Sequence, residues 1–147
     1  MYAQLKQTVQ KPKCLVIEDS VFDQRMIQRM IRGAGVDADV LFASSLEAAR
    51  RILATHRFSM ILCDNNLPDG NGTDFAQTLS NDPGYFDIPI VIVSGWPSPF
   101  MWAKAKAAGL PIIDKNDQLQ AKLAEFFRRR FGRGTTFGPR PKPKLIN

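Results

Sequence analysis

One aspartate, Asp64, stands directly after an apolar run that ends at Cys63, and a stretch rich in turn-forming residues follows it. A second acidic site, Glu18-Asp19, also follows an apolar run. Open α/β sheets place their chemistry at the carboxyl ends of their strands. If the two runs are neighbouring strands, three carboxylates meet there, and like charges at that distance require a cation or a proton.

Two further polar side chains, Ser94 and Lys115, stand at the ends of other apolar runs. Carboxylates and a backbone carbonyl are the hard oxygen ligands that suit Mg²⁺, which usually keeps several waters. A carboxylate beside such an ion can attack a phosphoryl group and form an acyl phosphate. A hydroxyl and an ammonium group can then hold the added phosphoryl oxygens. These residue types therefore favour phosphoryl transfer to a side chain.

Strand and helix patterns alternate along the chain and would position these residues. Short apolar runs predict five strands, at 14–18, 40–43, 60–64, 89–94 and 111–114. Amphipathic periodicity predicts five helices, at 21–33, 46–56, 73–79, 99–108 and 117–131, with Ser45 and Ser98 as N-caps. The alternation predicts an α/β fold, a doubly wound parallel sheet covered by helices on both faces.

Four motifs fall in order at these strand ends. They are Ile17-Glu18-Asp19-Ser20, Asp64-x-Asn66-x-Pro68 with Gly72 eight residues after Asp64, Ile92-Val93-Ser94-Gly95, and Asp114-Lys115. With them the chain resembles the receiver domain of two-component response regulators, and most of all the single-domain, chemotaxis-type members. The resemblance covers about residues 13–131 and implies a flavodoxin-like fold with five parallel strands in the order 2-1-3-4-5 and five helices.

The resemblance also implies a Mg²⁺ cofactor and the residues that hold it. Glu18 and Asp19 would form the acidic pair around the ion, with Asp19 as a direct ligand and Glu18 acting through water. Asp64 would contribute its carboxylate and Asn66 its backbone carbonyl. Asn65 lines the same site without an assigned role.

By the same resemblance, Asp64 would accept a phosphoryl group from a histidine kinase or phosphotransfer protein. Ser94 would be the switch hydroxyl that moves toward that group, and Lys115 would pair with the phosphorylated aspartate. The downstream protein target would bind the face built by the last two helices and the last strand. We expect a signalling switch rather than an enzyme.

Three departures from the family pattern concern the output side of the domain. Ile112 occupies the position, three residues before Lys115, where the family usually has an aromatic residue. Asn116 follows the lysine where the family usually has a proline, often in cis; a cis bond before a non-proline residue costs ~3 kcal/mol, so we expect a trans or strained bond. The segment from Gly109 to Lys115 is also one residue shorter than usual.

Large apolar side chains are crowded near residue 100. Phe100, Met101 and Trp102 are consecutive, and one short helix cannot bury all three against the same sheet. Part of this group, together with Trp96, should therefore be exposed. Packing on a neighbouring loop is one interpretation, and a protein-binding surface is our hypothesis.

Positive charge is concentrated at the end of the chain. Seven of the 20 basic residues follow Glu125 with no acidic residue among them, which leaves 13 against 14 acidic residues in the body, a net charge near −1. They are Arg128, Arg129, Arg130, Arg133, Arg140, Lys142 and Lys144. We expect residues 1–12 to be an N-terminal extension, 13–131 the receiver domain, and 132–147 a basic, Gly/Pro-rich, disordered tail.

Length and composition restrict the class of protein. The 147 residues suit one globular domain, and the sequence contains no membrane-spanning run and no secretory signal. Cys14 and Cys63 both lie in predicted strands, which suits buried free thiols in a reducing cytoplasm.

Two other functions compete with the phosphoacceptor switch. One is a receiver-like adaptor whose basic tail binds nucleic acid, an anionic membrane or a cyclic dinucleotide. The other is a small α/β phosphohydrolase, which is disfavoured because Asn66 stands where such enzymes carry a second aspartate.

Overall fold

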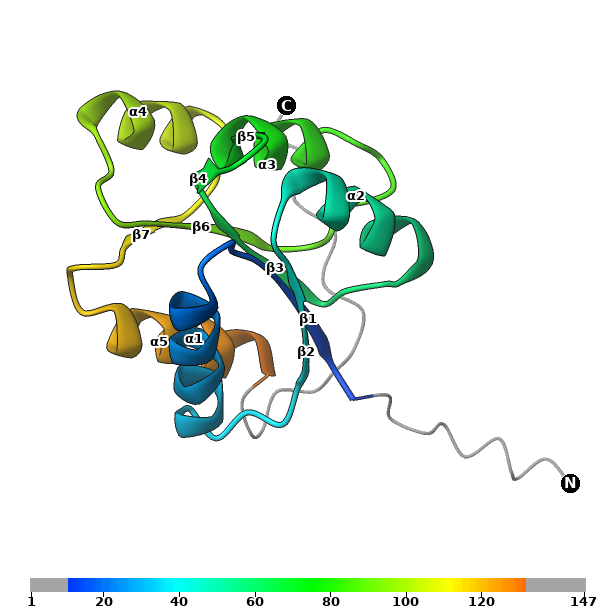
Figure 1. Ribbon diagram of the computed structural model, residues 1–147, viewed down its shortest axis with the longest axis vertical. Coiled ribbons are helices and arrows are strands. Elements are labelled where there is room, and N and C mark those ends of the chain that lie inside the picture. Colours follow the sequence, from blue (N-terminus) through cyan, green and yellow to red (C-terminus); the bar gives the residue numbers. More distant parts are fainter. Residues whose placement is uncertain (1–10, 132–147) are drawn as a thin grey trace, which may run out of the picture.

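A five-stranded parallel sheet runs through the middle of the computed structural model, which describes residues 11–131 (Figure 1). Its strands are β1 (Lys13–Ile17), β2 (Asp39–Ala43), β3 (Met60–Asp64), β6 (Ile90–Ser94) and β7 (Ile112–Asp114). They lie in the order β2-β1-β3-β6-β7, so the predicted order 2-1-3-4-5 is confirmed. A hairpin that the sequence analysis did not predict, β4 (Asn66–Leu67) with β5 (Gly70–Asn71), follows β3.

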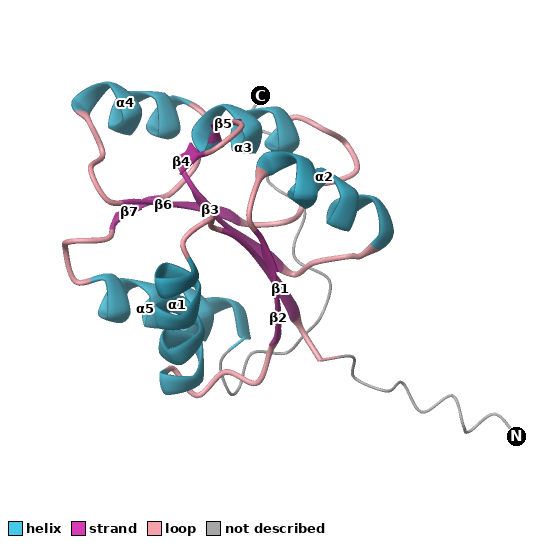
Figure 2. Ribbon diagram, in the orientation of Figure 1, coloured by secondary structure: helices cyan, strands magenta, loops and turns pink. Residues whose placement is uncertain are grey.

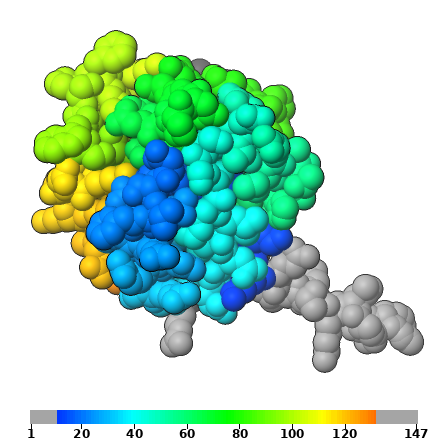
Figure 3. Space-filling model, in the orientation of Figure 1, coloured from blue at the N-terminus to red at the C-terminus, as the bar shows by residue number. Residues whose placement is uncertain are grey.

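Within residues 11–131, five helices cover the two faces of the sheet (Figure 2), and the described residues form one continuous body (Figure 3). They are α1 (Val21–Gly33), α2 (Leu46–Thr55), α3 (Gly72–Ser80), α4 (Pro99–Ala107) and α5 (Leu119–Phe131). Figure 1 shows α1 and α5 side by side on one face and α2, α3 and α4 on the other. The doubly wound sheet that the alternating patterns predict, and the flavodoxin-like fold that the family resemblance implies, are therefore confirmed.

Alternate residues of each strand belong to two separate hydrophobic cores. In β1, Leu15 and Ile17 face the core beneath α2, α3 and α4, whereas Cys14 and Val16 face the core beneath α1 and α5. This alternation follows from the period of two in a pleated strand. Because both faces of the central strands are covered, their sequences are continuously apolar, and both cysteines are buried and free.

Side-chain caps fix where most helices begin. The predicted N-caps Ser45 and Ser98 are confirmed, since their hydroxyls accept hydrogen bonds from the backbone amides of Ala48 and Met101. Only the start of α5 differs by more than one residue from the prediction. It begins at Leu119 rather than at residue 117, because Gln118 has a φ of 53°, outside the helical region.

The predicted terminal segments lie almost entirely outside the described residues, which exclude 1–10 and 132–147. Part of the predicted basic region, at the end of α5, is described. There Arg129 pairs with Glu125, and Arg130 donates a hydrogen bond to the backbone carbonyl of Ser59. Within residues 11–131, no helix is long and apolar enough to cross a membrane.

Gly72, the first residue of α3, allows the chain to turn back closely against β3. Its amide donates a hydrogen bond to the carbonyl of Asn65 at 2.8 Å. A Cβ atom at this position would overlap the carbonyl oxygen of Asp64 and lie 2.8 Å from its carbonyl carbon. The absence of a side chain at Gly72 therefore permits the tight return of the chain beside Asp64.

We expect Gly72→Ala to lower the free energy of unfolding by about 3 kcal/mol, because the added methyl group meets backbone atoms that cannot rotate away. Chemical denaturation followed by circular dichroism would measure the loss. Gly95→Ala is the matched control, since a Cβ there has no neighbour within 4 Å, and its effect should stay within about 0.5 kcal/mol. Equal stabilities for the two variants would contradict the steric explanation.

Candidate functional site

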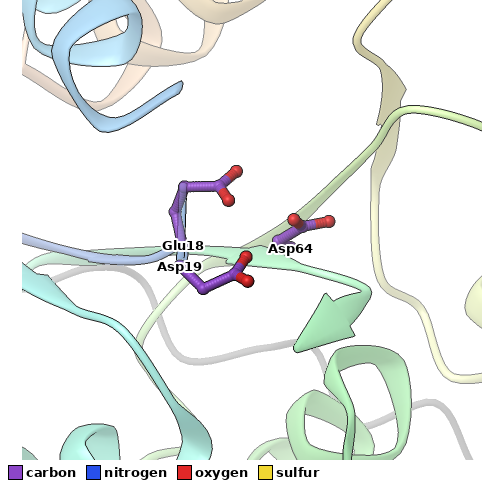
Figure 4. Close-up of side chains that lie close together, drawn as sticks. All are labelled: Glu18, Asp19 and Asp64. Carbon is purple, nitrogen blue, oxygen red and sulfur yellow. The ribbon is translucent and has the colours of Figure 1, made fainter. Parts of the chain in front are cut away.

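Three carboxylates converge at the carboxyl edge of the sheet (Figure 4). Glu18 and Asp19 follow β1, and Asp64 ends β3. The two strands are adjacent and parallel, with Ile17 opposite Cys63, so the next residues of each strand come side by side. One oxygen from each carboxylate lies within 4.8 Å of the others, with Glu18 and Asp64 buried and Asp19 exposed.

Lys115 reaches this cluster from the end of β7. Its backbone amide donates to the carbonyl of Ser94 at 2.8 Å, which extends the pairing of β6 with β7 beyond the strands. Its Nζ lies 2.6 Å from Glu18 Oε1 and 3.3 Å from Asp64 Oδ2. A third carboxylate, Asp23 on the first turn of α1, accepts from the same Nζ at 2.9 Å. Each of the three ammonium protons therefore has a carboxylate partner.

The crowding of these charged groups shifts the pKa values of Glu18 and Lys115. Burial, with a smaller contribution from the charge of Asp64, raises the pKa of Glu18 to about 7, although hydrogen bonds from Lys115 and from the amide of Ser20 act to lower it. For Lys115, burial alone would lower the pKa, but the hydrogen bonds to Glu18 and Asp23 and the charges of Asp64 and Glu18 raise it above its ordinary value. The lysine is therefore a permanent cation in the site.

Ser94 ends β6, between β3 and β7 at the same edge of the sheet. Its side chain is fully buried, yet its Oγ has no hydrogen-bond partner among residues 11–131. A buried hydroxyl without a partner costs free energy, so such groups are rare and concentrate at functional sites.

The loop after Asp64 is held in place by several hydrogen bonds. Asn65 is buried, and its Oδ1 accepts from both the amide and the hydroxyl of Thr73, at 3.2 and 2.7 Å. This gives Asn65 a positioning role that the sequence analysis left unassigned. Asn66 lies in β4, and its amide donates to Asp64 Oδ1 at 3.3 Å.

The same loop also caps the start of α2. Asp69, in the turn of the β4–β5 hairpin, accepts from the amides of Leu46 and Glu47 at the start of α2, at 2.8 and 2.9 Å. These two hydrogen bonds hold the pKa of the Asp69 carboxyl below its ordinary value. The hairpin is therefore tied both to the strand that precedes it and to α2.

The carboxylate cluster fits a hard divalent cation. In six-coordinate Mg²⁺, with ligands at about 2.1 Å, ligand oxygens are separated by about 3–4 Å. The oxygens of Glu18, Asp19 and Asp64 lie within 4.8 Å of one another, so small side-chain adjustments would bring them to that spacing. These three carboxylates have one lysine, Lys115, beside them, which leaves an excess of negative charge at the site.

The two residues that depart from the family pattern, Ile112 and Asn116, lie in and directly after β7. Ile112 is half-buried in β7, opposite Ile92. The Lys115–Asn116 bond is trans, since the described residues contain no cis peptide. Asn116 donates from Nδ2 to the carbonyl of Gly95 at 2.6 Å and so joins the loop after β7 to the loop after β6.

The fold and the site together define a flavodoxin-like α/β domain with an acidic centre at its carboxyl edge. A sequence model of the response regulator receiver domain matches residues 14–127, and the chain belongs to that family. The resemblance inferred from the four motifs is thereby confirmed.

Curated relatives include chemotaxis proteins and other response regulators. Chemotaxis protein CheY1 of Helicobacter pylori is 30% identical over 83 residues, which cover 56% of this chain and 66% of that protein. Response regulator Rcp1 of Synechocystis is 26% identical, over 54% of this chain and 59% of that protein. The aligned parts therefore span less than two thirds of these relatives' own length.

Solved structures with the same fold cover more of the chain. The phosphorylated cyanobacterial phytochrome response regulator RcpA superposes with a TM-score of 0.73 at 21% identity, over 86% of this chain and 98% of that one. The Mn²⁺-bound form of Rcp1 gives 0.72 at 20% identity, over 85% and 97%. Chemotaxis response regulator CheY4 of Vibrio cholerae gives 0.69 at 23%, over 83% and 100%.

We expect Mg²⁺ to raise the melting temperature more at about pH 8 than at about pH 5.5. With its pKa near 7, the carboxyl of folded Glu18 holds a proton at the lower pH. That proton must leave before the cation binds, at a cost of roughly tenfold in affinity per pH unit below the pKa. Thermal denaturation with and without Mg²⁺ at both pH values measures the difference.

The metal-free protein should show the opposite trend. The folded state binds the Glu18 proton more tightly than the unfolded chain, so this stabilisation is present at low pH and lost as pH rises from about 4.5 through 7. Glu18→Gln should remove both dependences. A Mg²⁺ effect that is independent of pH in the unaltered protein would contradict the assignment.

Proposed function

We propose that this protein is a phosphoacceptor signalling switch of a two-component phosphorelay, with residues 13–131 as the receiver unit. A histidine kinase or phosphotransfer protein would phosphorylate Asp64 in the presence of Mg²⁺. The observation that carries the proposal is the meeting of Asp64 with two further carboxylates and with Lys115 Nζ, 3.3 Å from its Oδ2. The phosphorylated and Mn²⁺-bound forms among the similar structures support it by analogy of fold.

In this mechanism, an oxygen of Asp64 forms a bond to phosphorus as the bond to the donor's nitrogen breaks, and that nitrogen leaves with the electron pair. Glu18, Asp19, Asp64 and the carbonyl of Asn66 would hold the Mg²⁺, which would neutralise charge on the transferring group. The amide of Asn66, 3.3 Å from Asp64 Oδ1, helps to fix the orientation of the acceptor carboxylate.

Two side chains would hold the added phosphoryl group. Lys115 contacts Asp64 directly, and its ammonium would pair with a phosphoryl oxygen. Ser94 would donate a hydrogen bond from its hydroxyl to another phosphoryl oxygen. The buried Oγ would then have the partner that it lacks among the described residues. Satisfying that hydroxyl gives the phosphorylated state an interaction that the unphosphorylated state does not have.

The output surface would be the face formed by α4, β7 and α5. Three aromatic side chains before and within α4 are exposed: Trp96 at 85%, Phe100 at 76% and Trp102 at 44%, whereas Met101 between them is buried. The expected partial exposure of this group is therefore confirmed. Trp102 and Ile112 also line an open groove of about 470 Å³ between α4 and β7, where a target protein would bind.

Incubation with acetyl phosphate and Mg²⁺ should add one phosphoryl group to the protein, because the crowded site offers one acceptor carboxylate and the charges to hold it. Intact-mass analysis would measure the gain. Asp64→Asn should abolish it, and Asp74→Asn, which changes an aspartate on α3, should not. A gain that survives in Asp64→Asn would refute the assignment of the acceptor.

We expect Trp102→Ala to weaken binding of the downstream target by about tenfold or more, because a partly exposed tryptophan supplies a large apolar contact. A pull-down from native lysate with the phosphorylated protein would identify the target, and titration calorimetry would measure its affinity. Phe86→Ala is the matched control, since Phe86 is a 57% exposed aromatic residue outside α4, β7 and α5. Unchanged binding in Trp102→Ala would refute this output surface.

A further inference from the structure

We propose that Asp23 is a positioning residue that competes with the phosphoryl group for the ammonium of Lys115. In this way Asp23 would set how firmly the phosphorylated state of Asp64 is held. The inference rests on the proposed phosphorylation of Asp64. It concerns a residue outside the four motifs, on the first turn of α1.

The contacts of Lys115 distinguish Asp23 from the other carboxylates. Within 4 Å, Lys115 Nζ has three carboxylate partners among the described residues: Glu18, Asp23 and Asp64. Glu18 and Asp64 belong to the cluster that fits a divalent cation, and Asp23 does not. When a cation draws on Glu18 and Asp64, Asp23 is therefore the partner that stays available to the lysine.

The position of Asp23 is fixed by the start of its helix. Ser20 caps α1, and its hydroxyl accepts a hydrogen bond from the amide of Asp23. The Asp23 side chain is 24% exposed and that of Lys115 is 13% exposed, so their 2.9 Å ion pair is partly shielded from water. Such a pair is stronger than a fully exposed one, and its loss should be measurable.

The direction of the effect follows from the number of ammonium protons. All three are donated to carboxylates before phosphorylation. Once the cation draws on Glu18 and Asp64, Asp23 is the partner with which a phosphoryl oxygen on Asp64 competes for hydrogen bonds from the lysine. Removing the charge of Asp23 weakens one of these competing hydrogen bonds and should strengthen the pairing of Lys115 with the phosphoryl group.

Beryllofluoride, which mimics a phosphoryl group on a carboxylate, provides a test that does not depend on turnover. Binding of BeF₃⁻ in saturating Mg²⁺ would be followed by tryptophan fluorescence or calorimetry. We expect Asp23→Asn to bind it about three- to tenfold more tightly than the unaltered protein. Asp23→Ala should show the same direction of change. Asp114→Asn is the matched control, one residue from Lys115 but without contact to its ammonium, and should change affinity less than twofold.

Repeating the Asp23 substitution in a variant without the Lys115 ammonium distinguishes competition for the lysine from a general effect of charge. In Lys115→Met the ammonium is absent, so Asp23→Asn should change BeF₃⁻ affinity less than twofold there. An equal gain in both backgrounds would overturn the inference, since it would show that charge at a distance accounts for the effect. Folding of each variant would be checked by circular dichroism, with Lys115→Gln as the alternative background.

The outcomes also distinguish this inference from the proposed function. If the unaltered protein binds BeF₃⁻ and Asp23→Asn binds it with the same affinity, the role of Asp23 is refuted and the switch stands. If the unaltered protein binds none with Mg²⁺ present, the phosphoacceptor function fails and the inference fails with it.

Discussion

The structure of the site depends on one largely shielded cation. The ammonium of Lys115 joins carboxylates from the end of β1, the first turn of α1 and the end of β3, residues that are 51 to 97 positions away from it in the sequence. Buried carboxylates at this spacing repel one another and would be costly without such a partner. The parallel sheet makes this meeting possible, because it brings the ends of β1, β3 and β7 to one edge, beside the start of α1.

Features that depend on local pattern could be predicted from the sequence. The continuous apolar runs reveal strands covered on both faces, and Ser45 and Ser98 reveal helix starts, because each depends on neighbours within a few residues. The meeting of Glu18, Asp19 and Asp64 also follows from a general rule, since adjacent parallel strands end at the same edge.

Features that depend on distant side chains could not be predicted in this way. Asp23 is typical of an acidic residue in the first turn of a helix, and no sequence pattern indicates that it contacts a lysine 92 residues away. Asp69 reads as a turn residue, although it caps a helix 23 residues earlier in the chain. Gln118 carries no sequence signal for its φ of 53°, which delays the start of α5.

The two sides of Asp64 differ in how closely they are tied to the rest of the domain. The hairpin side is cross-braced through Asn65 and Thr73, and through Asp69 to the start of α2. The α4 side has fewer ties: α4 buries only Met101 and Ala105, and an ion pair between Lys104 and Asp74 joins it to α3. Because α4 has fewer ties to the rest of the domain, we expect a change at the sheet edge to displace α4 more than the hairpin.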